Sequence, residues 1–190
     1  MRRCIKCILH ENLPGISFNS EGVCNYCQEY VPFKEYGEDK LLELIEPVRS
    51  SSGKHNCIVP ISGGRDSTYV LHLAKEVYGL NPLAVNFDNE FANPQAVKNI
   101  AGACRILDVD LMVVRSKHDI ATKFVRSNVR AGIPMGLRTL AGSFCRQCAY
   151  GYQGVVYMTA EKLQIPLILW GSSSAESTKD MRDLMVESKV

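Results

Sequence analysis

Residues 57–76, with the sequence CIVPISGGRDSTYVLHLAKE, decide the fold class of this chain. The first five residues form an apolar run typical of a buried strand, and the residues from Ser67 onward have the apolar spacing of a helix. Two glycines and small polar residues lie between them. Glycine lets the backbone approach a bulky anion, and a helix N-terminus adds free N–H groups and partial positive charge. The turn is therefore suited to bind phosphate or pyrophosphate.

The same alternation of strand and helix continues along the chain. Apolar runs at 81–87, 110–116 and 165–171 alternate with helix-like segments at 93–108, 117–132 and within 144–164. Another short amphipathic helix is predicted at 38–48. Continuous apolar strands alternating with helices predict a parallel sheet covered on both faces, which is the doubly wound α/β class. Such sheets bind ligands at the carboxyl ends of their strands, where the glycine-rich turn lies.

Composition limits the possible classes of protein. The chain has 190 residues, a length that favours one domain with perhaps a small appendage. Its residues are 46% hydrophobic, and its net charge is +2. The near-balanced charge argues against a large nucleic-acid footprint but leaves room for a local basic patch. No apolar run reaches the roughly 18 residues of a membrane helix, and we expect a cytoplasmic protein without membrane contact. Because a reducing compartment disfavours disulfides, the eight cysteines need another explanation.

Four N-terminal cysteines predict a zinc site. Cys4-x-x-Cys7 and Cys24-x-x-Cys27 are separated by sixteen residues, a spacing typical of two knuckles closing a tetrahedral thiolate site. A module this short has almost no apolar core, so a structural Zn²⁺ would supply its folding energy. We expect a zinc-ribbon module at 1–33, a helix and linker at 34–54, and the α/β domain at 55–190.

The turn at 62–67, SGGRDS, resembles the pyrophosphate loop S-G-G-x-D-S of the N-type ATP pyrophosphatases. It matches neither the Walker loop nor the dinucleotide pattern G-x-G-x-x-G. The resemblance implies a PP-loop domain with the HUP-like, adenine nucleotide alpha hydrolase-like fold. It also implies that ATP is split to AMP and pyrophosphate while a carbonyl-type oxygen is adenylylated, and that a nitrogen or sulfur nucleophile then displaces AMP.

This resemblance implies a set of site residues. Asp66, acting through Mg²⁺, and Ser67 would be catalytic. The residues implied to bind the nucleotide are Pro60, Ile61, Ser62, Gly63, Gly64, Arg65, Asp66, Ser67, Asn86, Phe87, Asp88 and Gly171.

A second resemblance concerns the N-terminal segment. Residues 3–28, RCIKCILHENLPGISFNSEGVCNYCQ, are similar to the N-terminal ribbon of the N-acetyl sugar amidotransferases of pseudaminic acid and lipopolysaccharide sugar synthesis. That resemblance implies conversion of an acetamido group of a sugar or nucleotide-sugar to an acetamidino group. A glutaminase with a cyclase-like subunit would supply the ammonia. Members of that family are longer, so we expect this chain to be C-terminally truncated, without part of the sugar pocket.

A third pair, Cys145 and Cys148, leaves an alternative open. We expect it just before a helix, whose N-terminus would lower the thiol pKa values. Some tRNA thiolation enzymes of the same superfamily use a C-x-x-C pair and a later cysteine to hold an iron–sulfur cluster, but this chain has no cysteine after Cys148. Basic residues could then contact tRNA, meet an anionic nucleotide-sugar, or form a solvated face. These are Arg115, Lys117, Lys123, Arg126, Arg130, Arg138 and Arg146.

Overall fold

Four parallel strands form one sheet in the order β3-β2-β1-β4. The computed structural model describes residues 1–13, 15–32, 34–51, 53–117, 119–135 and 137–172, without the side chains of 135–147. The strands are β1 (Cys57–Pro60), β2 (Pro82–Asp88), β3 (Asp110–Arg115) and β4 (Leu167–Ile168). Cys57 pairs with Pro82 on one side and with Leu167 on the other. The predicted doubly wound parallel sheet is confirmed, although β4 is shorter than its apolar run.

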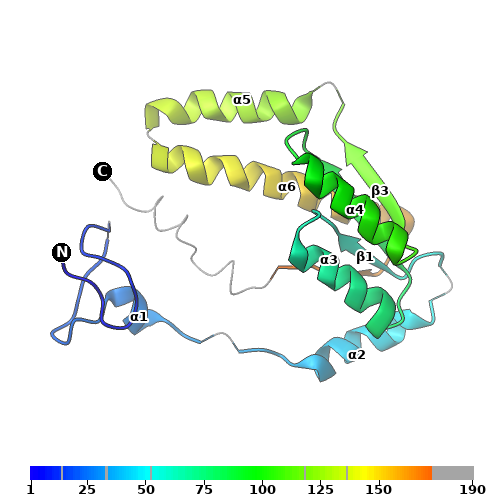
Figure 1. Ribbon diagram of the computed structural model, residues 1–190, viewed down its shortest axis with the longest axis horizontal. Helices are drawn as coiled ribbons and strands as arrows, with labels where there is room; N and C mark the ends of the chain where they lie inside the picture. The colour runs from blue at the N-terminus through cyan, green and yellow to red at the C-terminus, as the bar shows by residue number, and fades with distance from the viewer. Residues whose placement is uncertain (14, 33, 52, 118, 136, 173–190) are drawn as a thin grey trace.

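Helices cover both faces of the sheet (Figure 1). On one face, Cys57 and Val59 pack in a buried cluster with α2 (Glu38–Arg49), α3 (Arg65–His72) and α4 (Pro94–Ile106). On the other face, Ile58 and Val85 pack against Val156 of α6 (Leu137–Leu163). Neighbouring strand residues point to opposite faces, so a continuous apolar run is buried on both sides.

Local signals set several helix ends. The Asn93 side chain accepts a hydrogen bond from the Gln95 N–H at 2.8 Å, and Pro94 occupies the first turn of α4, as the sequence predicts. Helix α3 continues into a π-helical turn, η1 (Leu73–Val77). Gly79 follows with a φ of +61°, a conformation that ends helices and favours glycine.

The connection from β3 to β4 is a helical hairpin. Helix α5 (Ile120–Gly132) and the short 3-10 turn η2 (Ile133–Met135) precede α6, and Figure 1 shows α5 and α6 side by side, extending beyond the sheet. Because α6 begins at Leu137, Cys148 lies inside this helix. The expectation that the Cys145/Cys148 pair precedes a helix is therefore wrong, and the N-terminal lowering of thiol pKa does not apply.

The N-terminal module is small and rich in turns. It contains the short helix α1 (Asn25–Glu29) and two isolated antiparallel bridges, Arg3 with His10 and Phe18 with Cys24. Its core consists mainly of Cys4, Val23 and Cys24. Among the described residues, no helix is long and apolar enough to cross a membrane.

Candidate functional site

A cavity of about 400 Å³ lies at the carboxyl edge of the sheet. Strand β1 has β2 on one side and β4 on the other, so the strand order changes direction at β1. Doubly wound sheets bind ligands outside the carboxyl ends of their strands at such a switch point. The residues predicted from the sequence that line this cavity are Pro60, Ile61, Ser62, Gly64, Arg65, Asp66, Ser67, Asn86, Phe87 and Gly171.

Gly63 shapes the turn without lining the cavity. Its φ is +78°, and a Cβ added there would lie 2.3 Å from the carbonyl oxygen of Ala96. The Asn99 side-chain amide donates to the Gly63 carbonyl at 3.1 Å. A side chain at this position would clash with α4, so only glycine fits here.

The two serines of the turn hold it closed. The Ser62 N–H donates to Ser67 Oγ at 3.2 Å, and the two hydroxyl oxygens are also 3.2 Å apart. Gly64 is the N-cap of α3. A helix leaves its first N–H groups without intrahelical partners, so the first turn of α3 offers donors and partial positive charge at the cavity. This geometry is suited to bind an anion.

Asp66 stands at the rim of the cavity with its carboxylate accessible. Its side chain is 64% exposed and lies 3.2 Å from Nε of Arg65, whose side chain is 93% exposed. A carboxylate beside an anion site is a suitable ligand for a hard cation such as Mg²⁺. The residues present therefore fit a Mg²⁺–polyphosphate group, with Asp66 on the metal and the turn on the phosphates.

The end of β2 is tied to the turn, but Asp88 does not line the cavity. Asn86 donates its side-chain amide to the Ile61 carbonyl at 2.7 Å. The Asp88 carboxylate instead accepts from Arg115 Nε at 2.8 Å. The Arg115 guanidinium and the Glu90 N–H hold the pKa of Asp88 below its usual value. Asn89, one residue further along, lines the cavity in its place.

Helix α6 and the segment after β4 contribute residues that sequence reasoning missed. Tyr152 and Trp170 both line the cavity, with ring centroids 5.6 Å apart. The two ring planes are tilted by 56° to each other, and each ring offers an apolar face on which a planar base can pack. Trp170 directly precedes Gly171, so an aromatic residue at the predicted end of β4 is a signal that could have found it. The α6 residues depend on the fold of the hairpin, and their sequence carries no comparable signal.

Cys148 also faces this cavity. Its Sγ lies 3.8 Å from the side-chain amide nitrogen of Asn89, and the residue is half-buried. The side chain of Cys145 lies outside the described residues. The structure therefore places one thiol of the third pair beside the candidate site.

The four N-terminal thiols converge as predicted. Cys4 Sγ lies 3.8 Å from Cys27 Sγ, Cys7 Sγ lies 3.7 Å from Cys24 Sγ, and all four lie within 4.8 Å of one another. Burial raises the pKa of Cys4, but backbone N–H groups, led by that of Cys24, outweigh it and lower the pKa to about 6. Hydrogen bonding to Cys7, together with burial, raises the pKa of Cys27 to about 12. The donor set fits a metal ion that takes four thiolates.

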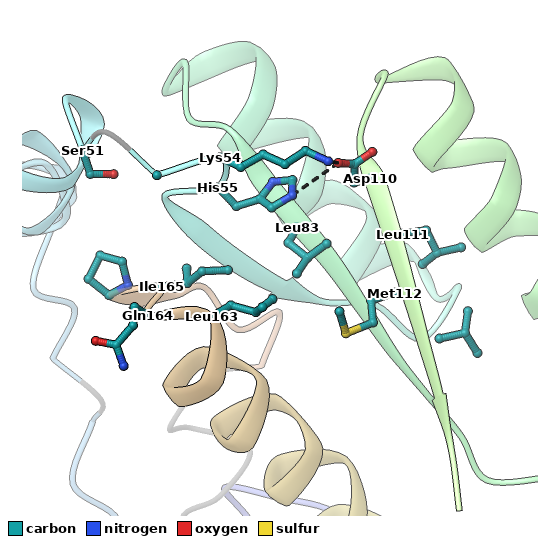
Figure 2. A pocket seen from close by; sticks show the side chains of 13 residues that line it. Ser51, Lys54, His55, Leu83, Asp110, Leu111, Met112, Leu163, Gln164 and Ile165 are labelled. Atoms are coloured by element: carbon teal, nitrogen blue, oxygen red, sulfur yellow. Dashed lines mark ion pairs between the residues drawn. The ribbon is translucent and has the colours of Figure 1, made fainter.

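A larger cavity, of about 950 Å³, lies at the opposite edge of the sheet (Figure 2). There Lys54 Nζ and His55 Nε2 approach the same Asp110 carboxylate oxygen, at 2.7 and 3.3 Å. This cavity lies at the amino ends of the strands, away from the glycine-rich turn. Because the smaller cavity combines the glycine-rich turn with the switch point, it is the candidate site.

Comparison with known proteins gives partial matches. No protein-family model matches the chain. The uncharacterized protein MJ1599 of Methanocaldococcus jannaschii is 27% identical over 159 residues, which cover 82% of this chain and 53% of that protein. The glutamine-hydrolyzing GMP synthase of Thermus thermophilus is 40% identical over 81 residues, 42% of this chain and 16% of that enzyme. The chain thus spans about half the length of the first relative and a smaller share of the second.

Solved structures give the fold. The NH3-dependent NAD synthetase of Campylobacter jejuni superposes with a TM-score of 0.50 at 18% identity, over 73% of this chain and 56% of that one. The NMN synthetase of Francisella tularensis gives a TM-score of 0.46 at 11% identity, over 75% and 57%. The U34-tRNA thiolase NcsA of Methanococcus maripaludis, solved with its 4Fe-4S cluster, gives 0.32 at 13% identity, over 100% and 74%.

The match to NAD synthetase confirms the predicted HUP-like fold. At this level of identity it concerns the fold alone.

Proposed function

We propose that this chain is an ATP-dependent transferase that forms AMP and pyrophosphate. The observation that carries the proposal is the turn at 62–67, which opens onto a cavity at the switch point between β1 and β4. The N–H groups of the first turn of α3 and the hydroxyls of Ser62 and Ser67 would hold the pyrophosphate portion of ATP. Asp66 would bind Mg²⁺, which neutralises charge as pyrophosphate leaves.

The remaining walls of the cavity would bind the nucleoside. Pro60, Ile61 and Phe87 offer apolar surface, and the rings of Tyr152 and Trp170 offer aromatic faces. Planar bases pack well on such surfaces. In this proposal the pyrophosphate lies at α3 and the adenosine reaches toward α6.

We propose nitrogen as the transferred atom and an N-acetyl sugar as the acceptor. The amide oxygen of the acceptor attacks the α-phosphorus of ATP and displaces pyrophosphate. Ammonia then adds to the amide carbon, AMP leaves with the former amide oxygen, and a proton is lost to give the acetamidino group. The names of two similar proteins, NH3-dependent NAD synthetase and glutamine-hydrolyzing GMP synthase, support nitrogen transfer. The N-terminal sequence supports the sugar acceptor.

The cofactors and partners in this proposal follow from the same residues. The thiols of Cys4, Cys7, Cys24 and Cys27 would hold a structural Zn²⁺. A glutaminase with a cyclase-like subunit would deliver ammonia to the cavity.

The test is acceptor-dependent turnover. The chain would be incubated with ATP, Mg²⁺, ammonium chloride and an N-acetylated nucleotide-sugar, and pyrophosphate, AMP and the mass of the sugar would be followed. The proposal expects AMP and pyrophosphate in equal amounts and a sugar in which NH replaces one oxygen. Pyrophosphate release without a change in the sugar would support the proposed ATP cleavage and contradict the proposal that the sugar is the acceptor.

The position of Cys148 favours a second candidate, tRNA thiolation. A thiol in the ATP cavity is a suitable ligand for an iron–sulfur cluster. Iron and acid-labile sulfide in anaerobically purified protein, lost in Cys148→Ser, would favour this candidate. Metal analysis that finds zinc without iron would favour the sugar amidotransferase.

A further inference from the structure

The cavity of about 950 Å³ at the amino ends of the strands is distinct from the candidate site. Among the residues that the structure describes, none lines both cavities. The walls come from the loop before β1, from β2 and β3, and from the end of α6 with the turn that follows it (Figure 2). The volume is within the range of about 300–1,000 Å³ typical of small-molecule sites. The chain therefore has room for a second ligand.

One side of this cavity carries an accessible ion pair. The side chains of Lys54 and Asp110 are 79% and 53% exposed, and Lys54 Nζ lies 2.7 Å from Asp110 Oδ2. The Lys54 ammonium holds the pKa of Asp110 below its usual value. An ion pair this exposed contributes little to folding stability. Its two charges are open to a ligand in the cavity.

The ion pair leaves hydrogen-bonding capacity unused. Lys54 and His55 both approach Asp110 Oδ2, and Oδ1 has no partner among the described residues. An ammonium group has three N–H donors, and that of Lys54 uses one of them here. His55 Nδ1 is buried without a hydrogen-bond partner in the described part of the chain. Buried polar atoms without partners are rare in native proteins, which distinguishes this cluster from an ordinary surface ion pair.

The rest of the cavity is largely apolar. Leu83 of β2 and Met112 of β3 lie next to the charged groups, and Leu163 and Ile165 approach from the end of α6 (Figure 2). Leu163 is 48% exposed although its side chain is apolar. An apolar group of a ligand that covers this surface removes it from water, which is favourable.

We propose that this cavity binds an α-amino acid with a large apolar side chain, in its zwitterionic form. Asp110 Oδ1 accepts a hydrogen bond from the ammonium group of the ligand, Lys54 donates to its carboxylate, and its side chain covers Leu83 and Met112. A zwitterion fits because the ion pair has no net charge: a ligand that is only anionic is repelled by Asp110, and one that is only cationic is repelled by Lys54. This inference goes beyond the proposed function and does not depend on it.

The experiment titrates the ¹⁵N-labelled full chain with L-leucine or L-phenylalanine, without ATP, and follows the amide NMR shifts. Saturable shifts are expected at Gly53, His55 and Ile165 and not at Ser67. Two analogues of leucine each lack one charge: 4-methylpentanoate has no ammonium group, and 3-methylbutylamine has no carboxylate. Each should bind at least about tenfold more weakly than leucine, the loss expected for one hydrogen bond to a charged group.

Two variants test which side chain recognises which charge. Lys54→Ala should weaken leucine binding at least about tenfold and should not weaken binding of 3-methylbutylamine, which has no carboxylate to lose. Asp110→Asn should weaken leucine binding to a similar extent and should not weaken binding of 4-methylpentanoate. A general loss of structure would weaken binding of every ligand and would not give this crossed pattern.

The matched control removes another exposed ion pair, that of Lys40 and Glu43 on α2, by Lys40→Ala with Glu43→Gln. It should leave leucine binding at the wild-type value, and equal weakening in the control would overturn the proposal. Binding of 4-methylpentanoate as tight as that of leucine would mean a site for apolar anions and would overturn it too. So would the absence of saturable shifts at the cavity with both amino acids. Because ATP is absent from the titration, the outcome is independent of the proposed function.

Discussion

Gly171, after strand β4, lies directly against Ser67 in the first turn of helix α3. A Cβ added to Gly171 would sit 2.9 Å from both the Cα and the backbone nitrogen of Ser67. A Cβ atom does not approach non-bonded heavy atoms that closely, so the two segments can touch because residue 171 is glycine. This contact joins the two sides of the switch point, and Gly171 and Ser67 both line the candidate site.

Gly171→Ala is accordingly expected to impair the site more than the fold. The added methyl group would push the segment after β4 away from α3, and a displacement of about 1 Å can reduce activity by roughly 100-fold. Pyrophosphate release and thermal unfolding would be measured together. The control is Gly154→Ala in α6, where nothing lies within 4 Å of the added Cβ. Equal activity in the two variants would contradict the role assigned to this contact.

Gly63→Ala is expected to destabilise the protein as well as the site. The backbone has a φ of +78°, which costs an L-residue about 1–2 kcal/mol, and the Cβ would also meet the Ala96 carbonyl oxygen at 2.3 Å. The melting temperature should fall. Gly102→Ala, inside α4 with open space around the Cβ, should raise stability by about 1 kcal/mol. A Gly63→Ala variant as stable as wild type would show that the turn has another conformation.

Asp66→Ala tests the chemistry of the turn. The side chain is 64% exposed, so its removal should leave folding intact. Loss of the proposed Mg²⁺ ligand should reduce pyrophosphate release by about 100-fold or more. Asp39→Ala, at an exposed position of α2, is the matched control and should retain activity. Full activity of Asp66→Ala would remove this residue from the proposed mechanism.

The strands and most helices could be predicted from sequence because each carries a local signal. The apolar runs gave three of the four strands to within about two residues, and Asn93 with Pro94 marked the start of α4. The fourth run was longer than β4, since only Leu167 and Ile168 pair with β1. Strand length depends on the partner strand, which a single segment does not reveal.

Features set by tertiary packing could not be predicted in the same way. Helix α6 begins at Leu137, although Gly142 and Ser143 suggest a break, because it lies against α5 in the hairpin. Asn89 lines the cavity and Asp88 does not. The Asp88 carboxylate instead accepts a hydrogen bond from Arg115 on the neighbouring strand β3. Which of these two adjacent residues lines the cavity can be predicted only when the register of β2 and β3 is known.

The ion pair of Asp88 and Arg115 predicts a pH-dependent contribution to stability. Arg115 lowers the pKa of Asp88 in the folded state, so the contribution is present above the unfolded pKa of about 3.9 and is lost as pH falls through the folded value. Wild type should unfold at a higher temperature than Asp88→Asn at neutral pH, and the difference should shrink below about pH 4. Asp39→Asn, exposed on α2, should show no such trend. A difference that grows on acidification would contradict the pairing.

The N-terminal thiols predict a metal that stabilises one module and not the other. Purified protein should contain about one metal ion per chain, as a four-thiolate site requires. Cys24 is fully buried among the other three thiols, so Cys24→Ser should lose the ion. Residues 1–30 should then become sensitive to protease, because the module has almost no apolar core besides its cysteines.

The α/β domain has separate buried clusters on both sheet faces, so its unfolding transition should remain. Cys104→Ala, in the core against α4, is the control and should keep the metal. Retention of the ion by Cys24→Ser would place the metal elsewhere, and simultaneous unfolding of both parts would show that the module and the sheet fold as one unit.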